Sequence, residues 1–222
     1  ISYHGSPHFA IYARFWGAYA EGMRITFLGA GSTIFAKNVL GDAMLTPSLQ
    51  AAEIHLYDID GQRLRDSERM LQNLNRNLNG GRSVIRSFCG ETERESALRG
   101  ADFVVNAVQV GGYDPATIID FEVPARYGLR QTIGDTLGIG GIFRGLRTLQ
   151  VMLPVVREME AVCPDALLLN YANPMSIITG ALLKVSGVAT VGLCHSVQVC
   201  VPRLLSYVGL ELPTEEVQWH IA

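Results

Sequence analysis

Apolar and polar residues follow two different periods along this chain. From Met23 onward, short apolar runs such as "RITFLGA" and "ADFVVNAVQ" are separated by longer stretches in which apolar residues recur at helical spacing. The short runs are apolar on both faces, which is typical of central strands in a parallel sheet. The longer stretches, such as "QRLRDSERMLQNLNRNL", have one apolar face, which is typical of helices. The pattern therefore predicts repeated strand–helix units in an α/β fold.

The predicted strands and helices alternate, except that two helices follow the fourth strand. Strands are predicted at residues 24–30, 52–60, 83–88, 101–109, 165–174 and 188–194. Helices are predicted at residues 34–45, 62–78, 93–100, 115–128, 141–163, 175–187 and 197–209. Because proline has no N–H to donate, we expect an interruption near Pro124 and a kink or a break at Pro154. Units of this kind form a doubly wound parallel sheet of Rossmann type.

In such a sheet, ligands bind beyond the carboxyl ends of the strands. The segments that follow the predicted strands are therefore the candidate site. They are residues 29–32, 58, 106–112, 170–174 and 194–196.

The first of these segments has the features of a dinucleotide site. "FLGAGSTIF" places Gly29 and Gly31 between a strand and a helix, where glycines allow a tight turn and a close approach to a pyrophosphate. Ser32 follows, while Ile34 stands where the G-x-G-x-x-G pattern has its third glycine. Asp58 ends the second strand, where an acid can bind the ribose hydroxyls of NAD and would repel the 2′-phosphate of NADP. These residues predict NAD binding, with a simple cap of the strand end as the alternative for Asp58.

Two later segments suit a sugar or an anion. "IGDTLGIGGIFRGLRT" is glycine-rich and enters a helix, which predicts a mobile binding loop. In it, Asp135 can accept hydrogen bonds from sugar hydroxyls, and Arg144 on the first helical turn opposes the helix dipole, which indicates a functional need. Asn173, held extended by Pro174, can point its amide into the site. The alternatives are a solvated arginine and a turn asparagine.

The stretch "VGLCHSV" ends the last predicted strand on Cys194 and His195. A cysteine there can be a small core residue, a reactive nucleophile or a metal ligand. A position at the carboxyl end of a strand disfavours the core, and no partner cysteine or base motif supports a nucleophile, so a metal ligand is favoured. Because adjacent strand residues point to opposite faces, we do not expect Cys194 and His195 to bind one metal together.

The composition argues against nucleic acid and membranes as partners. The 222 residues are 48% apolar and 18% charged, with a formal net charge of −3, which suits a globular core and leaves no basic surface for nucleic acid. No uninterrupted apolar run reaches the roughly 20 residues of a membrane span, so we expect no membrane partner. The four cysteines include no C-x-x-C pair, which is typical of a reduced, cytoplasmic protein.

The two ends depart from the strand–helix pattern. Residues 1–22 lack the features of a signal peptide, and Met23 directly precedes the first predicted strand. We expect residues 1–22 to be a non-native or read-through leader and residues 23–212 to form the dinucleotide-binding domain. Residues 213–222 are expected to begin a truncated C-terminal catalytic domain.

Taken in order, "GAGS", "YDID", "NAVQVGG", "GDTLGIGGIFRGLRT", "NYANPM" and "GLCHSV" resemble glycoside hydrolase family 4 from Met23 to the end. The tetrapeptide "CHSV" is similar to that of the α-galactosidase (melibiase) subgroup. The resemblance implies a glycosidase that needs NAD and a divalent metal such as Mn²⁺, outside the two-carboxylate scheme. It implies oxidation of the sugar at C3, elimination of the leaving group, addition of water and return of the hydride. It also implies a small-molecule glycoside substrate and, for the full-length protein, a homo-oligomer.

The resemblance also implies residue roles. Cys194 matches the metal-binding cysteine, and Asn173 matches an asparagine that contacts sugar hydroxyls near the metal. His195 falls where some members carry an acid that assists the leaving group, which makes it the candidate catalytic residue. Asp135 and Arg144 match loop positions near the substrate. The family's second metal ligand, a histidine, and its catalytic tyrosine lie further along, so we expect this chain alone to be inactive.

Other functions remain open at this point. A malate- or lactate-type dehydrogenase would share the dinucleotide site and the hydride step but would need no metal thiolate. A non-catalytic nucleotide-binding module would bind NAD without turnover. Within the family, an α-glucoside or an α-uronide is the alternative substrate.

Overall fold

The structure is a computed structural model that describes residues 22–133, 136–194, 196–210, 212 and 217. By its internal contacts the chain divides into two compact units, Ile1–Gly192 and Leu193–Ala222. Each unit is described by itself. The domain boundaries predicted after residues 22 and 212 stay predictions.

The first unit is built on a six-stranded sheet in the order β3-β2-β1-β4-β5-β6. Every neighbouring pair is parallel. The strands are β1 (Arg24–Leu28), β2 (Glu53–Asp58), β3 (Val84–Cys89), β4 (Phe103–Asn106), β5 (Leu167–Asn170) and β6 (Ala189–Gly192). The strand order reverses between β1 and β4, so the predicted doubly wound sheet of Rossmann type is confirmed.

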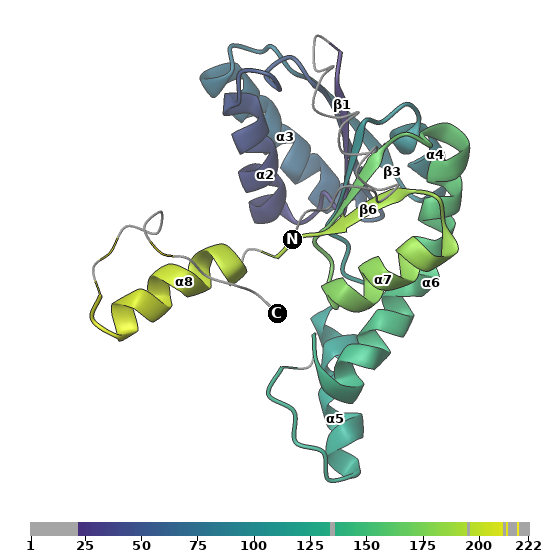
Figure 1. The fold of residues 1–222 in the computed structure, drawn as a ribbon. Coiled ribbons are helices and arrows are strands. Elements are labelled where there is room, and N and C mark those ends of the chain that lie inside the picture. Colours follow the sequence, from purple (N-terminus) through teal and green to yellow (C-terminus); the bar gives the residue numbers. More distant parts are fainter. Residues whose placement is uncertain (1–21, 134–135, 195, 211, 213–216, 218–222) are drawn as a thin grey trace, which may run out of the picture. The chain divides into compact units, whose positions relative to one another are not determined.

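Helices cover both faces of this sheet. They are α2 (Thr33–Leu45), α3 (Gly61–Leu78), α4 (Arg94–Leu98), α5 (Ile118–Arg126), α6 (Gly138–Val162) and α7 (Met175–Val185). A short 3₁₀ helix (Glu91–Glu93) precedes α4, and a π-helical turn (Gly112–Thr117) precedes α5. Figure 1 shows α2 and α3 against one face of the sheet and α4, α6 and α7 against the other. The second unit contains α8 (Ser196–Tyr207).

Each face of the sheet has its own apolar core. On the α2–α3 face, Phe27 and Leu56 are fully buried. On the opposite face, Met152 of α6 packs with Leu168 of β5, and both are fully buried. The two cores explain why the central strands are apolar on both faces, as the sequence pattern predicts.

By length and apolar composition alone, one described helix, α6, would be able to cross a membrane. In this fold its inner face, including Met152, Val156 and Met159, is part of the core beneath the sheet. Core helices of globular proteins meet the same criterion. The expected absence of a membrane partner stays a prediction.

The two helical prolines are accommodated without the predicted breaks. Pro124 lies inside α5, and Pro154 lies inside α6, which runs on for 25 residues. Pro124 has no N–H for the carbonyl of Asp120 four residues earlier, and the Gln131 side chain donates to that carbonyl at 3.0 Å instead. A partner from outside the helix therefore compensates for the missing donor.

Candidate functional site

The turn that the sequence predicts to bind a dinucleotide, called here the dinucleotide turn, lies between β1 and α2. Gly29 has φ +85°, and its N–H donates to the carbonyl of Tyr57 at 2.9 Å. A Cβ at Gly29 would lie 2.8 Å from the backbone carbonyl of Ala107, which follows β4. Both the left-handed backbone and the close approach require glycine here. The turn after β1 is therefore packed against the loop after β4.

Gly31 is required for a different reason. Its N–H donates to Asp58 Oδ2 at 2.7 Å, and a Cβ at Gly31 would lie 2.8 Å from that same oxygen. The other carboxylate oxygen, Oδ1, accepts from the N–H of Asp60 at 2.9 Å. The structure thus brings Gly31 and Asp58 together, 27 residues apart in sequence. The missing side chain at Gly31 leaves room for the carboxylate that ends β2.

The start of α2 faces the same turn. Ser32 is the residue before the helix, but its side chain makes no capping hydrogen bond to the helix. The first amides of a helix carry partial positive charge and attract anions when no side chain caps them. Ile34, in the place of the third glycine, is 76% exposed. Gly29, Gly31, Ser32 and Asp58 therefore lie around one cradle whose geometry fits a dinucleotide, and their role in binding it stays a prediction.

Two buried asparagines join the loops after β4 and β5. Asn106 and Asn170 are register partners at the ends of these strands, and Asn106 Nδ2 donates to Asn170 Oδ1 at 2.8 Å. Each amide also holds its own loop, because Asn106 Oδ1 accepts from Val108 N–H and Asn170 Oδ1 accepts from Ala172 N–H. The sequence predicts ligand-binding segments at residues 106–112 and 170–174, but it does not reveal this role of the two asparagines.

Arg144 and Asn173, two predicted substrate residues, are brought together. Arg144 Nε donates to the backbone carbonyl of Asn173 at 3.2 Å, and both residues are half-buried. The prediction that Arg144 lies on the first helical turn is wrong. The helix α6 begins at Gly138, so Arg144 lies on its second turn. The argument from the helix dipole therefore does not apply to it. Asp135 lies outside the described residues.

The glycine-rich segment before Arg144 is helical from Gly138 onward instead of forming a loop throughout. Its glycines allow close packing. A Cβ at Gly141 would lie 2.9 Å from the backbone of Thr136, and a Cβ at Gly145 would lie 3.0 Å from Ile177 Cγ2. This half of the segment is thus a closely packed helix start.

An ion pair that the sequence pattern does not predict lies beside the site. Arg147 Nη1 and Nη2 donate to the two carboxylate oxygens of Asp120 at 3.1 and 2.6 Å, and Arg147 Nε donates to the carbonyl of Val110 at 3.2 Å. Asp120 is 1% exposed. The hydrogen bonds with Asp120 raise the pKa of the Arg147 guanidinium. The available signal was an aspartate between two apolar residues, Ile119 and Phe121, in the helix "IIDFEVPAR".

Cys194 follows β6 by two residues, belongs to the second unit and is exposed. His195 lies outside the described residues. Among the described residues, no group of three or more histidine, cysteine, aspartate or glutamate side chains is placed to hold a metal ion. A single thiol does not make a metal site, so the described residues do not fit a bound Mn²⁺ by themselves.

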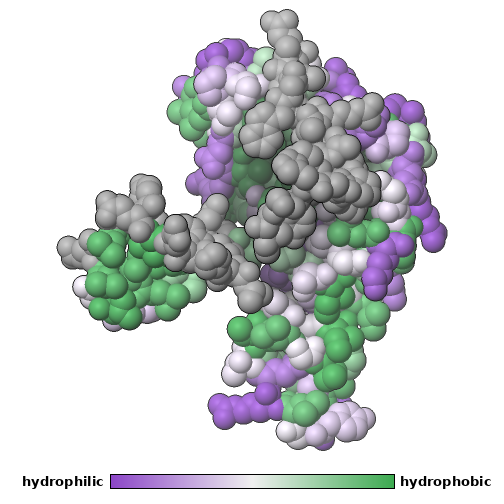
Figure 2. Space-filling view, viewed as in Figure 1, coloured by the Kyte–Doolittle hydropathy of each residue, from purple (hydrophilic) through white to green (hydrophobic). Residues whose placement is uncertain are grey.

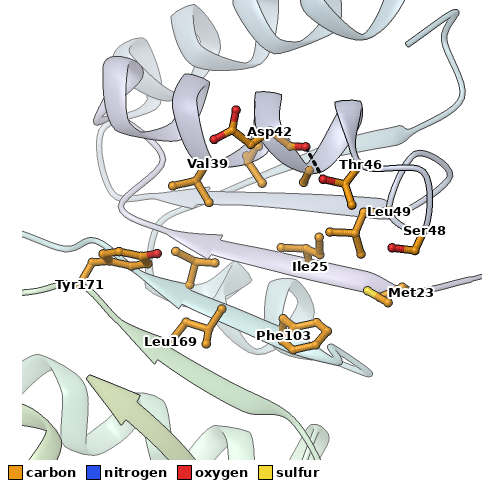
Figure 3. Close-up of a pocket in the computed structure, with 13 residues that line it drawn as sticks. Met23, Ile25, Val39, Asp42, Thr46, Ser48, Leu49, Phe103, Leu169 and Tyr171 are labelled. Carbon is orange, nitrogen blue, oxygen red and sulfur yellow. Dashed lines mark hydrogen bonds between the residues drawn. The ribbon is translucent and has the colours of Figure 1, made fainter. Parts of the chain in front are cut away.

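A separate apolar groove of about 450 Å³ lies between α2 and strands β1, β4 and β5. Figure 3 shows Met23 and Tyr171 at its opposite ends. The Tyr171 ring packs edge-on against Phe35, with 5.0 Å between the ring centres. The lining has few polar groups, so this groove does not fit a phosphate or a ribose and is distinct from the dinucleotide turn.

Comparison with known sequences gives consistent matches. A sequence model described as family 4 glycosyl hydrolase matches residues 24–210. The chain is 56% identical over 188 residues to an α-galactosidase of Bacillus subtilis, covering 85% of this chain and 43% of that protein. It is 34% identical over 187 residues to an α-galactosidase of Rhizobium meliloti, covering 84% and 37%. An α-glucosidase of Erwinia rhapontici is 33% identical over 175 residues, with 78% and 38% covered.

Solved structures share the fold of this chain. A putative glucosidase of Bacillus subtilis matches with a TM-score of 0.73 and 28% identity, over 87% of this chain and 44% of that one. A 6-phospho-β-glucosidase of Thermotoga maritima, solved with manganese, NAD⁺ and glucose-6-phosphate, has the same fold, with a TM-score of 0.69, 21% identity and coverage of 85% and 44%. A malate dehydrogenase of Picrophilus torridus shares the fold less closely, with a TM-score of 0.55, 17% identity and coverage of 85% and 51%.

The chain spans about two fifths of the length of the curated relatives that it matches. Within that span, the family match covers the dinucleotide turn, the loops after β4 and β5, and Cys194. These matches show that the chain belongs to family 4 of the glycosyl hydrolases.

Proposed function

We propose that this chain is the NAD-binding part of an α-galactosidase. The match to the Bacillus subtilis α-galactosidase, at 56% identity, supports this substrate above the others. The "CHSV" tetrapeptide at Cys194 supports the same subgroup. An α-glucoside is the second candidate, because a relative that is 33% identical is an α-glucosidase. A protein that contains this chain together with the rest of the family's length is the active enzyme under this proposal.

The observation that carries NAD binding is the cradle formed by Gly29, Gly31 and Asp58. Gly29 lets the turn pack against Ala107, Gly31 leaves room for the Asp58 carboxylate, and the uncapped start of α2 attracts a pyrophosphate. Asp58, whose carboxylate accepts two backbone N–H bonds, is oriented to accept ribose hydroxyl hydrogen bonds in addition. NAD, when bound, supplies a hydride acceptor for C3 of the sugar. The Thermotoga maritima structure with NAD⁺ supports the same ligand here.

The remaining predicted residues complete the proposal. Asn173 and Asp135 are proposed to hydrogen-bond sugar hydroxyls, and Arg144 is proposed to fix the loop that carries Asn173. Cys194 is proposed as one metal ligand, with the other ligands outside the described residues. His195 is proposed to assist the leaving group. A cytoplasmic location, a homo-oligomer and the absence of nucleic-acid and membrane partners are proposed with them.

NAD binding is tested on the 222-residue chain by calorimetric titration. We expect saturable binding that Gly29→Ala abolishes, because its new Cβ would meet Ala107 at 2.8 Å. Gly81→Ala is a matched control, since Gly81 has a similar φ of +75° but nothing within 4 Å of its added Cβ. This variant should bind NAD as the unchanged chain does. Absence of NAD binding in the unchanged chain would overturn the proposal.

The activity is tested on a full-length protein that contains this chain. With NAD⁺, Mn²⁺ and a thiol reductant, it should cleave p-nitrophenyl α-galactoside faster than p-nitrophenyl α-glucoside, and chelation of the metal should stop cleavage. Cys194→Ser should raise the Mn²⁺ concentration needed for half-maximal activity. Oxidation of α-hydroxy acids without a metal would favour a dehydrogenase, and NAD binding without any turnover would favour a regulatory module.

A further inference from the structure

Every nitrogen of the Arg147 side chain is engaged in a hydrogen bond. The two terminal nitrogens hold the carboxylate of Asp120, which is 1% exposed, and Nε holds the carbonyl of Val110. A planar guanidinium that is fixed by a bidentate pair has little freedom left. Arg147 therefore connects a buried charge on α5 with one defined point on the loop that follows β4.

That loop, residues 107–112, is held at both ends. At its start, Ala107 N–H donates to the carbonyl of Leu28 at 2.9 Å, and the backbone of Ala107 abuts Gly29. At its far end, Gly111 has φ +87°, and a Cβ there would lie 3.2 Å from Arg147 Nε. The loop thus runs from the dinucleotide turn to the Arg147 side chain.

The side of α6 that carries Arg147 also contacts Gln131 and the loop that contains Asn173. Gly140, Arg144 and Arg147 are spaced by four and three residues on α6, which puts them on one side of the helix. The N–H of Gly140 donates to Gln131 Oε1, and Arg144 Nε donates to the carbonyl of Asn173. Gln131 donates in turn to the carbonyl of Asp120. This face of α6 therefore holds Gln131 and the loops after β4 and β5 together.

The direction of a bound dinucleotide follows from the sheet. The acid at the end of β2 takes the ribose of the adenosine half, and the ligand crosses the sheet edge where the strand order reverses, between β1 and β4. The nicotinamide half then lies on the β4 side, where loop 107–112 begins. A shift of this loop would affect that half of NAD and not the adenosine half.

We propose that Arg147 and Asp120 are positioning residues that fix loop 107–112 for the nicotinamide half of NAD. Neither residue is proposed to touch the cofactor. The proposal rests on the NAD binding proposed above and names the part of this chain that would distinguish the two halves of the ligand.

The test compares NAD with AMP as ligands of the 222-residue chain, by calorimetric titration. Arg147→Lys keeps the positive charge but loses the planar fork, so the loop carbonyl loses its fixed donor. We expect this variant to bind NAD about tenfold more weakly, in line with the loss of one hydrogen bond to a charged group. Its affinity for AMP should change by less than about twofold, because AMP lacks the nicotinamide half. Asp120→Asn should give the same split.

Arg24→Lys is the matched control. Arg24 also binds one carboxylate, that of Glu53, and one backbone carbonyl, that of Arg99. It lies at the amino end of β1, away from the carboxyl ends of the strands where the dinucleotide turn lies. A general loss of stability would affect the Arg24 and Arg147 variants alike in thermal unfolding. Only Arg147→Lys should change the ratio of the NAD and AMP affinities.

The outcomes separate this inference from the proposed function. If the unchanged chain binds neither ligand, the proposed NAD binding fails. If the unchanged chain binds both ligands, and Arg147→Lys or Asp120→Asn binds NAD and AMP as tightly as the unchanged chain does, the positioning role is wrong. Should both variants fail to fold, hydrogen exchange of the unchanged chain decides. NAD must then protect the amides of residues 107–112 while AMP does not, and equal protection by both ligands overturns the role.

Discussion

Asp58 is held by its own turn before any ligand arrives. Its two oxygens accept backbone N–H bonds from Gly31 and Asp60, so its negative charge is fixed at the edge of the cradle. A fixed charge at this point acts on any phosphate placed on the adenosine ribose. Under the proposed NAD binding, the charge of Asp58 therefore sets the choice between NAD and NADP.

This predicts a preference for NAD over NADP that depends on Asp58. Asp58→Asn removes the charge that repels the 2′-phosphate, and we expect the ratio of NAD to NADP affinity to fall about tenfold, as one lost charge interaction of about 1.4 kcal/mol would give. Calorimetric titration of both cofactors measures this ratio. An unchanged ratio would show that the preference has another source.

The carboxyl of Glu53, at the amino end of β2, should make the free energy of unfolding depend on pH. Partial burial acts to raise its pKa, but the hydrogen bonds from Arg24 and His55 outweigh burial and lower the pKa below the ordinary value of 4.5. A carboxyl with a lowered folded pKa contributes stability above pH 4.5, which is lost as the pH falls through the folded pKa. Glu53→Gln should therefore be destabilising at pH 7 and less destabilising at an acidic pH well below 4.5.

Urea unfolding at the two pH values measures this difference. Glu122→Gln is the control, because the Glu122 side chain is 59% exposed and its nearest charged partner, Arg126, is 3.8 Å away. It should change the free energy of unfolding little at either pH. An equal loss from Glu53→Gln at both pH values would exclude the ionic contribution.

At the scale of elements, the glycines of the helices differ in what surrounds them. Gly145 of α6 faces Ile177 of α7, where an added Cβ would be 3.0 Å from Cγ2, whereas Gly180 of α7 has nothing within 4 Å. The first lets two helices approach closely, and the second is a glycine without a packing reason.

Substitution to alanine should separate these two roles. Gly180→Ala should raise the free energy of unfolding by about 0.5 to 1 kcal/mol, because alanine favours the helix and meets no neighbour. At Gly145 the same gain is offset by contact with Ile177, so Gly145→Ala should be less stable than Gly180→Ala. Urea unfolding of both variants is the measurement, and equal stabilisation would contradict the packing role of Gly145.

Periodicity predicted the strands, the helices and the sheet class because these depend on which residues are apolar and at what spacing. It predicted the cradle of Gly29, Gly31 and Asp58 because that motif is local to one strand–turn–helix–strand unit. It could not predict the tolerance of Pro124, which depends on Gln131 from a later loop. Nor could it predict the pairing of Asp120 with Arg147, which lies 27 residues away and depends on how α5 and α6 meet.

At the scale of the whole molecule, apolar side chains gather on the end formed by α5 and the start of α6. Figure 2 shows them as a green area on that end of the first unit. They include the exposed Ile139, Ile142 and Leu146. Their spacing puts them on one side of α6. The sequence pattern predicts a helix at residues 141–163, but which of its sides is exposed depends on the tertiary arrangement.

The burial of each cysteine in the folded chain predicts how fast its thiol reacts. Cys89, Cys194 and Cys200 are exposed, whereas Cys163 is buried and its burial raises the pKa of its thiol to about 11. At pH 8 about a thousandth of Cys163 would be thiolate, so it should react slowly. A colorimetric thiol reagent should modify the other cysteines in the folded chain and Cys163 only after unfolding. Fast modification of Cys163 in the folded chain would contradict the fold around it.

The pair formed by Asn106 and Asn170 has a consequence for how the chain chooses one strand alignment. β4 and β5 are short and largely apolar, and apolar side chains alone tolerate more than one offset between neighbouring strands. Sliding β5 by one residue would turn Asn170 to the other face and leave the Asn106 amide buried without its partner, which is costly. The hydrogen bond between the two amides therefore favours the observed register, in which Asn106 pairs with Asn170 and the loops after both strands begin side by side.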